Sequence, residues 1–493
     1  MCKTCTGGFV CTLFFFLGDI FMADKKTIGI ISGLNPRAAL EVKTQLLAQS
    51  DDDICIIMSE DTFKIDPDPE LAMSDRKIFI FNEAELLAEM GADIVAVPDF
   101  KCGRFIHEVQ REMQTPILDM KAALMAQMQE KAPVMGVLDT TNAASCMSGE
   151  CELGQKMKMI FSTEEEEAAL NVAREQIRSG DMVTPMATLE AVCKRMVEAG
   201  AEVIIPNCTQ FALLQKELAA KGFPVMDVFA AFAAAALVYP TTKLPKPFKL
   251  GLIGGLGPAA TVDLYDKIVK ATPAKNDQEH FKVVIEQNPQ IDDRTACLLE
   301  GGADPTLAMY NCAKRLQKDG CDVAIIPCNT AHAFLPRLLR HLDMPFIDMQ
   351  QTMLDEIQAK FGDKARVGLM ATSGTIRTGI YGKKADKMNM AMFVPDAQHQ
   401  ERVMAAIYGP KGAKAGFTTG ECYDDLYSAA EYLVKEHDCN VLILGCTELP
   451  LIFHEQDDFE VAGKKVAIVD PTATLARKCV AIAEATIKER GVR

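Results

Sequence analysis

Short apolar segments alternate along the chain with longer segments whose apolar residues recur every three or four positions. In the second half, the apolar segments are rich in Val, Ile and Leu, as is typical of strands buried on both faces. We therefore predict strands at 249–254, 282–286, 322–326, 345–348, 366–370, 440–444 and 465–469. Strands separated by helical segments indicate an α/β fold with mainly parallel sheets covered by helices.

The same pattern of apolar and polar positions occurs twice. Each copy opens with an apolar run, a glycine turn, a proline and a helical segment, as in "TIGIISGLNPRAALEV" and "KLGLIGGLGPAATVDL". Three pairs of segments match in order: 27–47 with 249–269, 91–120 with 320–349, and 201–214 with 439–452. The offset rises only from 222 to 238 residues, which indicates a duplicated domain with small loop insertions.

A linker separates the two copies. The segment "YPTTKLPKPFKLG" (239–251) carries three prolines and three lysines between two apolar segments. We predict four parts: an N-terminal extension at 1–23, a first domain at 24–240, a linker at 241–248 and a second domain at 249–493.

The extension contains an apolar run, "GGFVCTLFFFLGDIFM" (7–22), that is too short to span a bilayer comfortably. No signal-peptidase site of the A-x-A kind follows it. We interpret it as a dispensable extension before a soluble start at Met22, with a membrane anchor as the alternative.

Composition and charge limit the classes of function that the protein can have. The 493 residues are 49% apolar and 24% charged, as in soluble globular proteins. A net charge of -16, without Lys/Arg-rich runs, argues against a basic surface for nucleic acid. The seventeen cysteines lack zinc-site spacing, and the chain is too long to need a disulfide framework. We expect reduced thiols in a cytoplasmic protein, no metal site, and a few local cations if the substrate is an anion.

Two cysteines follow predicted strands at equivalent places, Cys328 in "PCNTAH" and Cys446 in "GCTELP". Ligands in such sheets bind beyond the carboxyl ends of strands. We expect a helix to start after each cysteine, because a helix N-terminus favours the thiolate. Two thiols in one cleft would remove and deliver a proton on opposite faces of one carbon, which is two-base racemisation. Taken singly, either cysteine is also consistent with an inert buried thiol.

On its motifs, the second half resembles the aspartate/glutamate racemase superfamily of cofactor-independent racemases, and most of all its aspartate racemase branch. The matching motifs run in the family's order: "GGLGPAAT" (254–261), "NPQIDDRT" (288–295), "PCNTAH" (327–332), "KAG" (414–416) and "GCTELP" (445–450). Glu448 stands where glutamate racemases typically have His, which favours the aspartate branch. The resemblance implies that each domain consists of two α/β subdomains, with the active site between them.

The resemblance also implies site roles. Cys328 and Cys446 correspond to the acid/base thiols, and Arg294 and Lys414 to binders of the substrate carboxylates. From the residues alone, the loop-like segment "GPKGAKAG" favours a solvated surface lysine at Lys414. Further candidates for substrate binding lie beside the thiols or at another strand end: Asn329, Thr330, Thr447, Thr372, Ser373 and Thr375. Candidates for support are His332, Glu448, Gly255 and Gly257. No pyridoxal phosphate, other cofactor or metal is required.

The first half keeps the fold pattern but lacks the pair of thiols. Asp99 stands where the second half has Cys328, whereas Cys208 is retained at the place of Cys446. Gln210 replaces Glu448, and Arg178 aligns with Lys414. We predict a domain that does not racemise and serves either as a pseudo-dimer partner or as a regulatory ligand site. A one-thiol chemistry at Cys208 and Asp99 is a further alternative.

The sequence thus predicts an isomerase: a cofactor-independent amino-acid racemase acting on aspartate or glutamate. Two alternatives stay open, namely another isomerase or decarboxylase of the superfamily acting on a small dicarboxylate, and a non-catalytic amino-acid-binding protein. The expected partner is a small acidic amino acid, with no nucleic acid and no membrane. The assembly would be a pseudo-dimer within the chain or a homodimer, because relatives of the family are often homodimers.

Overall fold

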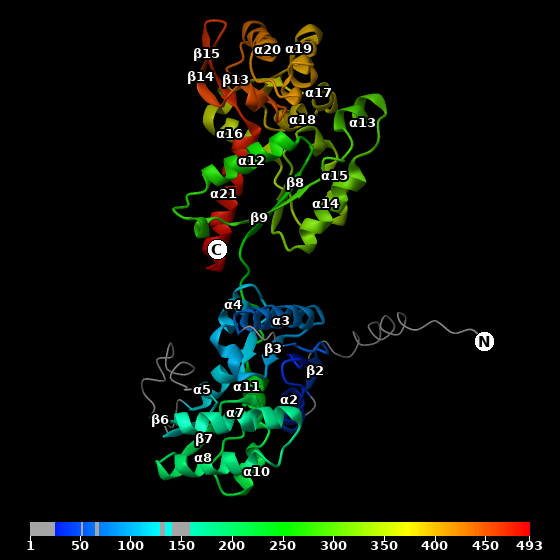
Figure 1. Ribbon diagram of the computed structural model, residues 1–493. Helices are drawn as coiled ribbons and strands as arrows, with labels where there is room; N and C mark the ends of the chain where they lie inside the picture. Colours follow the sequence, from blue (N-terminus) through cyan, green and yellow to red (C-terminus); the bar gives the residue numbers. More distant parts are fainter. Residues whose placement is uncertain (1–24, 51–52, 65–68, 129–133, 141–157) are drawn as a thin grey trace, which may run out of the picture. The chain divides into compact units, whose positions relative to one another are not determined.

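The computed structural model describes residues 25–50, 53–64, 69–128, 134–140 and 158–493. The predictions made for the N-terminal extension lie outside these residues. The chain divides into two compact units, Met1–Leu244 and Pro245–Arg493, which are described separately below (Figure 1).

Unit 1 contains two sheets in which every pairing is parallel. The strand orders are β2-β1-β3-β4 and β6-β5-β7. The strands are β1 (Lys26–Ile30), β2 (Ile54–Met58), β3 (Ile94–Val97), β4 (Ile117–Asp119), β5 (Met135–Leu138), β6 (Met159–Phe161) and β7 (Val203–Pro206).

Helices cover both sheets of unit 1. The apolar helix α11 returns to the first sheet, where Phe229 and Phe232 are buried in one core with Ile28 and Ile30. Burial of aromatic and β-branched side chains supplies most of the stability of such a layer. The helices are α2 (Pro36–Gln49), α3 (Pro69–Glu89), η1 (Phe100–Arg104), α4 (Ile106–Arg111), α5 (Met120–Met128), α7 (Glu164–Ser179), α8 (Met186–Glu198), α9 (Thr209–Ala212), α10 (Gln215–Ala220) and α11 (Val228–Val238).

Unit 2 repeats this arrangement with a larger second sheet. The strand orders are β10-β8-β9 and β12-β11-β13-β15-β14, and only β14 among these strands runs antiparallel to its neighbour. The strands are β8 (Lys249–Gly254), β9 (Lys282–Gln287), β10 (Val323–Ile325), β11 (Arg366–Met370), β12 (Ala391–Phe393), β13 (Val441–Leu444), β14 (Gln456–Val461) and β15 (Lys464–Val469).

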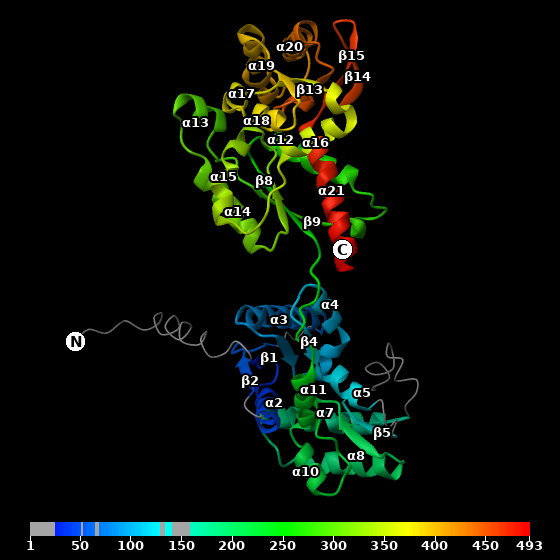
Figure 2. The ribbon, with the colours of Figure 1, turned by 180° about the vertical axis from the view of Figure 1, so that it is seen from behind.

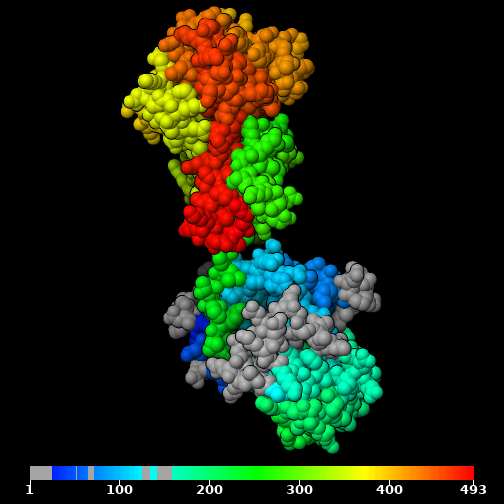
Figure 3. Space-filling view, turned by 90° about the vertical axis from the view of Figure 1, so that its left-hand side faces the viewer, coloured from blue at the N-terminus to red at the C-terminus, as the bar shows by residue number. Residues whose placement is uncertain are grey.

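The C-terminal helix of unit 2 joins its two subdomains. This helix, α21, begins after the last strand of the second sheet and packs beside α12, with Leu475 and Cys479 in one core with Leu250 and Leu252 (Figures 2 and 3). The helices are α12 (Pro258–Ala271), η2 (Asp277–Glu279), α13 (Arg294–Glu300), α14 (Thr306–Lys318), η3 (Thr330–Ala333), α15 (Leu335–Leu338), η4 (Leu339–His341), α16 (Met349–Phe361), η5 (Gly362–Lys364), α17 (Ser373–Thr378), α18 (Ile380–Lys387), α19 (Ala397–Tyr408), η6 (Ala413–Ala415), α20 (Glu421–His437), η7 (Leu449–Leu451) and α21 (Pro471–Arg490).

The predicted α/β class, the mainly parallel sheets and the repeat are confirmed. The order β2-β1-β3 of unit 1 corresponds to β9-β8-β10 of unit 2, and β6-β5-β7 corresponds to β12-β11-β13. One predicted strand differs. At 345–348 the structure has a single bridge between Ala324 and Phe346, because Asp348 already caps α16 by accepting hydrogen bonds from two backbone N–H groups. The strands β12 and β14 were not predicted.

Two further properties concern the described part of the chain as a whole. None of its helices combines the length and apolarity needed to cross a membrane. Its twelve cysteines are all unbridged, and ten of them are buried.

Candidate active site

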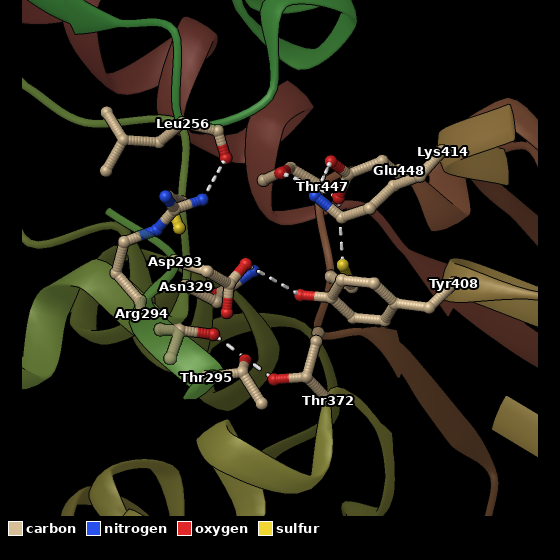
Figure 4. A pocket seen from close by; sticks show the side chains of 14 residues that line it. Leu256, Asp293, Arg294, Thr295, Asn329, Thr372, Tyr408, Lys414, Thr447 and Glu448 are labelled. Carbon is tan, nitrogen blue, oxygen red and sulfur yellow. Dashed lines mark hydrogen bonds and ion pairs between the residues drawn. The ribbon is translucent and has the colours of Figure 1, made fainter. Parts of the chain in front are cut away.

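A small cavity lies at the carboxyl ends of β10, β11 and β13 of unit 2 (Figure 4). It brings together nine of the predicted site residues: Arg294, Cys328, Asn329, Thr330, Thr372, Lys414, Cys446, Thr447 and Glu448. The two sulfur-bearing side chains, Cys328 and Cys446, are each almost fully buried. The structure thus places both thiols at the same enclosed space, contributed by strands of the two different sheets.

Cys446 is held as a neutral thiol in this structure. It follows β13 and donates a hydrogen bond from Sγ to Glu448 Oε2 at 2.9 Å. Burial, and then the adjacent Glu448 carboxylate, raise the pKa of the Cys446 thiol well above its ordinary value. The prediction of a thiolate stabilised by a helix N-terminus is therefore wrong for this residue. The helix that follows, η7, is a single 3₁₀ turn and has little dipole to offer.

Glu448 links Cys446 to Lys414. Lys414 Nζ lies 3.1 Å from Glu448 Oε1, so the carboxylate has a cation on one oxygen and a thiol on the other. Burial opposes the charge of Lys414, but Glu448, Tyr408 and Cys446 together raise the pKa of the lysine. A Cβ at Gly257 would lie 2.6 Å from Glu448 Oε1, so glycine there leaves room for the carboxylate.

Arg294 lies on the other side of the cavity and is anchored by backbone carbonyl groups (Figure 4). Its terminal nitrogens donate to the carbonyl oxygens of Leu256, Ile291 and Asp292 at 2.6, 3.2 and 3.0 Å. Its Nε has no nitrogen or oxygen partner among the described residues. Burial opposes its charge, yet interaction with Cys328, and then with Asp293 and Tyr408, raises the pKa of Arg294. This guanidinium is positioned to stabilise negative charge beside the first thiol.

The side chain of Asn329 provides a second hydrogen-bond donor that has no partner among the residues described. Its side-chain oxygen accepts a hydrogen bond from the hydroxyl of Tyr381, which fixes the orientation of the amide. Its Nδ2 is buried and has no partner within the described part of the chain. An unpaired buried donor is costly unless a ligand satisfies it. Arg294 Nε and Asn329 Nδ2 are therefore both available to an oxygen-bearing ligand.

The threonines of the cavity form a network that joins the subdomains. Thr330 Oγ1, after β10, lies 3.2 Å from Thr372 Oγ1 and 2.8 Å from Thr375 Oγ1, both after β11. Thr447 donates from Oγ1 to the carbonyl oxygen of Pro327 at 3.2 Å. These bonds hold the strand ends of the two sheets against each other.

Five predicted residues do not line the cavity: Ser373, Thr375, His332, Gly255 and Gly257. Ser373 faces α19 instead, where its hydroxyl accepts a hydrogen bond from Gln400 at 3.2 Å. His332 accepts from the Met349 backbone N–H at Nε2, so its Nδ1 carries the proton that is donated to the Cys328 carbonyl oxygen at 2.9 Å. With both ring nitrogens occupied, His332 holds the backbone of Cys328. Gly255 and Gly257 shape the turn above the site.

Five lining residues were not predicted: Leu256, Asp293, Thr295, Tyr408 and Gly445. Four of them lie in the motifs that carry the resemblance, namely Leu256, Asp293, Thr295 and Gly445. Tyr408 ends α19 and has no motif around it. Burial raises the pKa of Tyr408 to about 12, and its ring lies 5.0 Å from Lys414 Nζ. Among the described residues, no group of three or more His, Cys, Asp or Glu side chains forms a possible metal site.

Comparisons with known proteins identify a family for this chain. The family model described as Asp/Glu/Hydantoin racemase matches residues 31–236 and again residues 253–479. The broad specificity amino-acid racemase RacX of Bacillus subtilis is 26% identical over 240 residues, which are 47% of this chain and 96% of that protein. Glutamate racemase of Aquifex pyrophilus is 28% identical over 159 residues, 31% of this chain and 58% of that protein.

Among solved structures, the Picrophilus torridus aspartate racemase aligns with a TM-score of 0.39 and 28% identity, covering 50% of this chain and 95% of that chain. The resemblance noted in the motifs is confirmed by the family model, which matches both units. The chain belongs to the Asp/Glu/Hydantoin racemase family, as a tandem repeat of two family domains.

Proposed function

We propose that unit 2 is a cofactor-independent amino-acid racemase that acts on aspartate or glutamate by proton transfer between Cys328 and Cys446. The observation that carries this proposal is the single cavity that both thiols line, together with the buried donors of Arg294 and Asn329. The relatives named above are an amino-acid racemase and a glutamate racemase, which supports the same reaction class.

The proposed chemistry needs one thiolate and one thiol. The thiolate removes the α-proton from one face of the substrate, and the opposite thiol delivers its proton to the other face. The electron pair left on the α-carbon takes up the delivered proton, so the product is the other enantiomer and the two thiols have exchanged protonation states. Cys446 in its neutral form is suited to be the donor in one direction.

The cavity offers three groups for the negative charges of an acidic amino acid. Arg294 Nε and Asn329 Nδ2 are unpaired donors, and Lys414 is the cation on the opposite side. In an enclosed site these groups also stabilise the negative charge that develops on the substrate carboxylate as the α-proton leaves. We assign the α-carboxylate to the unpaired donors and the side-chain carboxylate to Lys414.

The test uses the full chain and a panel of L-amino acids. We expect D-isomer formation by chiral chromatography, and exchange of the α-hydrogen with solvent deuterium, for aspartate or glutamate. Cys328→Ala and Cys446→Ala are each expected to lower racemisation by at least about 100-fold, because each removes an acid/base group.

Two other buried cysteines of unit 2 provide matched controls. Cys312 and Cys439 lie outside the cavity, so Cys312→Ala and Cys439→Ala should retain activity. Racemisation that survives in both cavity variants would rule out the two-thiol mechanism. Absence of exchange with every amino acid of the panel would rule out the racemase itself.

A further inference from the structure

Unit 1 has a cavity at the same place in its fold as the active-site cavity of unit 2. It is lined by residues that follow β3, β5 and β7, which correspond to β10, β11 and β13. It is larger than the cavity of unit 2. Duplication has therefore left a second and larger cavity, and its lining shows what it is suited to bind.

The floor of this cavity does not support proton transfer between two thiols. Asp99 stands at the place of Cys328, pairs with Arg76 at 3.2 Å and caps η1 through the Lys101 N–H at 2.7 Å. Cys208 donates from Sγ to Gln210 Oε1 at 3.2 Å. Burial, and then the charge of Asp139, raise the pKa of Cys208 to about 11, so this thiol is neutral at pH 7. Cys208 is the only thiol among the described lining residues, so no second thiol is placed there for two-base chemistry.

The wall of the cavity is rich in cations, although the protein as a whole carries a net charge of -16. Among the described residues, five cationic side chains line it against three carboxylates, those of Asp99, Asp139 and Glu175. The cations come from three elements: Arg76 from α3, Lys101 and Arg104 from η1, and Arg174 and Arg178 from α7. Because Arg174 and Arg178 are four residues apart on a helix, they lie on the same face and can act on one ligand.

An apolar wall adjoins these cations. Leu34, Phe63, Met73 and Phe100 line the same cavity, and Phe100 stands where unit 2 has the polar Asn329. The guanidinium carbon of Arg76 lies 5.0 Å from the centre of the Phe63 ring, so the charged and apolar walls meet there. A ligand that fits both walls carries negative oxygens at one end and an apolar body at the other.

We propose that this cavity of unit 1 is a binding site for an organic anion that is larger than aspartate and combines an apolar body with two negative charges on carboxylate or phosphate groups. Arginine side chains recognise both kinds of oxyanion through paired N–H groups. The inference is independent of the function proposed for unit 2, because it rests on the lining of unit 1 alone.

Hydrogen–deuterium exchange of the full chain, read peptide by peptide, tests this site and separates it from unit 2. The probes are phthalate and phenyl phosphate, each compared at equal ionic strength with succinate and inorganic phosphate, which lack the apolar body. At millimolar concentration, we expect phthalate or phenyl phosphate to protect peptides containing Lys101, Arg178 or Cys208. The preferred probe of the two identifies the oxyanion. Succinate and phosphate should require at least about tenfold more ligand.

Matched charge variants provide the control. Arg174→Gln with Arg178→Gln removes two cavity cations that pair with Glu175, and should weaken protection by at least about tenfold. Lys194→Gln with Lys221→Gln removes two cations of unit 1 that pair with surface carboxylates outside the cavity, and should leave protection unchanged. If the double arginine variant alters the exchange pattern without ligand, the single Arg178→Gln variant replaces it, because Arg178 is exposed.

Three outcomes would overturn the proposal. The first is that none of the four probes protects unit 1. The second is protection confined to peptides of unit 2, around Cys328 and Cys446. The third is equal protection in the arginine and lysine variants, which would indicate an unspecific effect of charge.

Discussion

The charge state of a single sulfur depends on the two side chains next to it. Cys446 shares the oxygens of Glu448 with Lys414, so a carboxylate disfavours the thiolate while an ammonium group favours it. In an enclosed site with a low effective dielectric, such neighbours shift a pKa far more than they would in water. The protonation of Cys446 is therefore open to adjustment by substituting either neighbour.

Glu448→Gln and Lys414→Gln should change the reactivity of Cys446 in opposite directions. Loss of the Glu448 charge lowers the pKa of the thiol, whereas loss of the Lys414 charge raises it. A shift of one pKa unit changes the thiolate fraction about tenfold below the pKa. We expect alkylation of Cys446 at mildly alkaline pH, followed by peptide mass spectrometry, to be about tenfold faster in Glu448→Gln and slower in Lys414→Gln. Equal rates in both variants would contradict this coupling.

Asn329→Asp tests the unpaired donor with almost no change in shape. The acceptor for Tyr381 is retained, but the free Nδ2 becomes an oxygen that repels a substrate carboxylate. Losing a hydrogen bond to a charged group costs about 1.5 to 3 kcal/mol. We expect kcat/KM to fall by about 10-fold to 100-fold, mainly through KM. Gln398→Glu, on the exposed part of α19, adds the same charge away from the cavity and should leave both constants unchanged.

At the scale of elements, strands buried on both faces were readable from the sequence. Segments such as 249–254 and 366–370 are continuous apolar runs, and the structure has β8 and β11 there. The edge strand β14 escaped prediction because it is mostly exposed and its sequence, "QDDFEV", has no apolar run. A strand of that kind is defined by its pairing with β15 rather than by its own residues.

The site residues that directly follow such strands could also be predicted, because motifs mark the ends of these strands. Cys328 and Cys446 follow apolar strands, and nine predicted residues meet in the cavity. Helices were expected after the two thiols, and the structure has the short 3₁₀ helices η3 and η7 there. The sequence did not distinguish the two, because 3₁₀ turns and longer helices share the same start signals. Tyr408 reaches the cavity through the packing of α19, which no local pattern encodes.

In the turn after β8, one added methyl group should strongly destabilise unit 2. Gly255 has a φ of +90°, and a Cβ there would lie 2.4 Å from the carbonyl carbon of Asn288. Gly255→Ala should therefore lower the free energy of unfolding of unit 2 by at least about 2 kcal/mol. Gly382→Ala, within α18, meets no atom within 4 Å and should instead be neutral or stabilising by up to about 1 kcal/mol. Urea unfolding compares the two; equal effects would show that the turn tolerates a side chain.

At the scale of the whole molecule, each unit buries its own apolar residues. The clusters that contain Phe232 and Phe453 draw all their members from unit 1 and unit 2, respectively. A chain with separate cores is expected to unfold in separate steps. The duplication thus gives two family domains whose stabilities can be changed one at a time.

Core truncations test this independence. Phe232→Ala and Phe453→Ala each remove a fully buried ring and should each cost about 3 to 5 kcal/mol. In differential scanning calorimetry, we expect two transitions, with Phe232→Ala lowering one Tm and Phe453→Ala lowering the other. A single transition that moves with either substitution would show that the two units unfold together.

The buried, unbridged cysteines can serve as natural probes of local unfolding. Ten of the twelve cysteines in the described part of the chain are shielded from solvent, and they are distributed over both units. A thiol reagent reaches a buried sulfur that lines no cavity only when the surrounding structure opens, so the rate of labelling there measures the opening of its own region. Cys102 and Cys193 report on unit 1, and Cys312 and Cys479 on unit 2, without any probe having to be introduced.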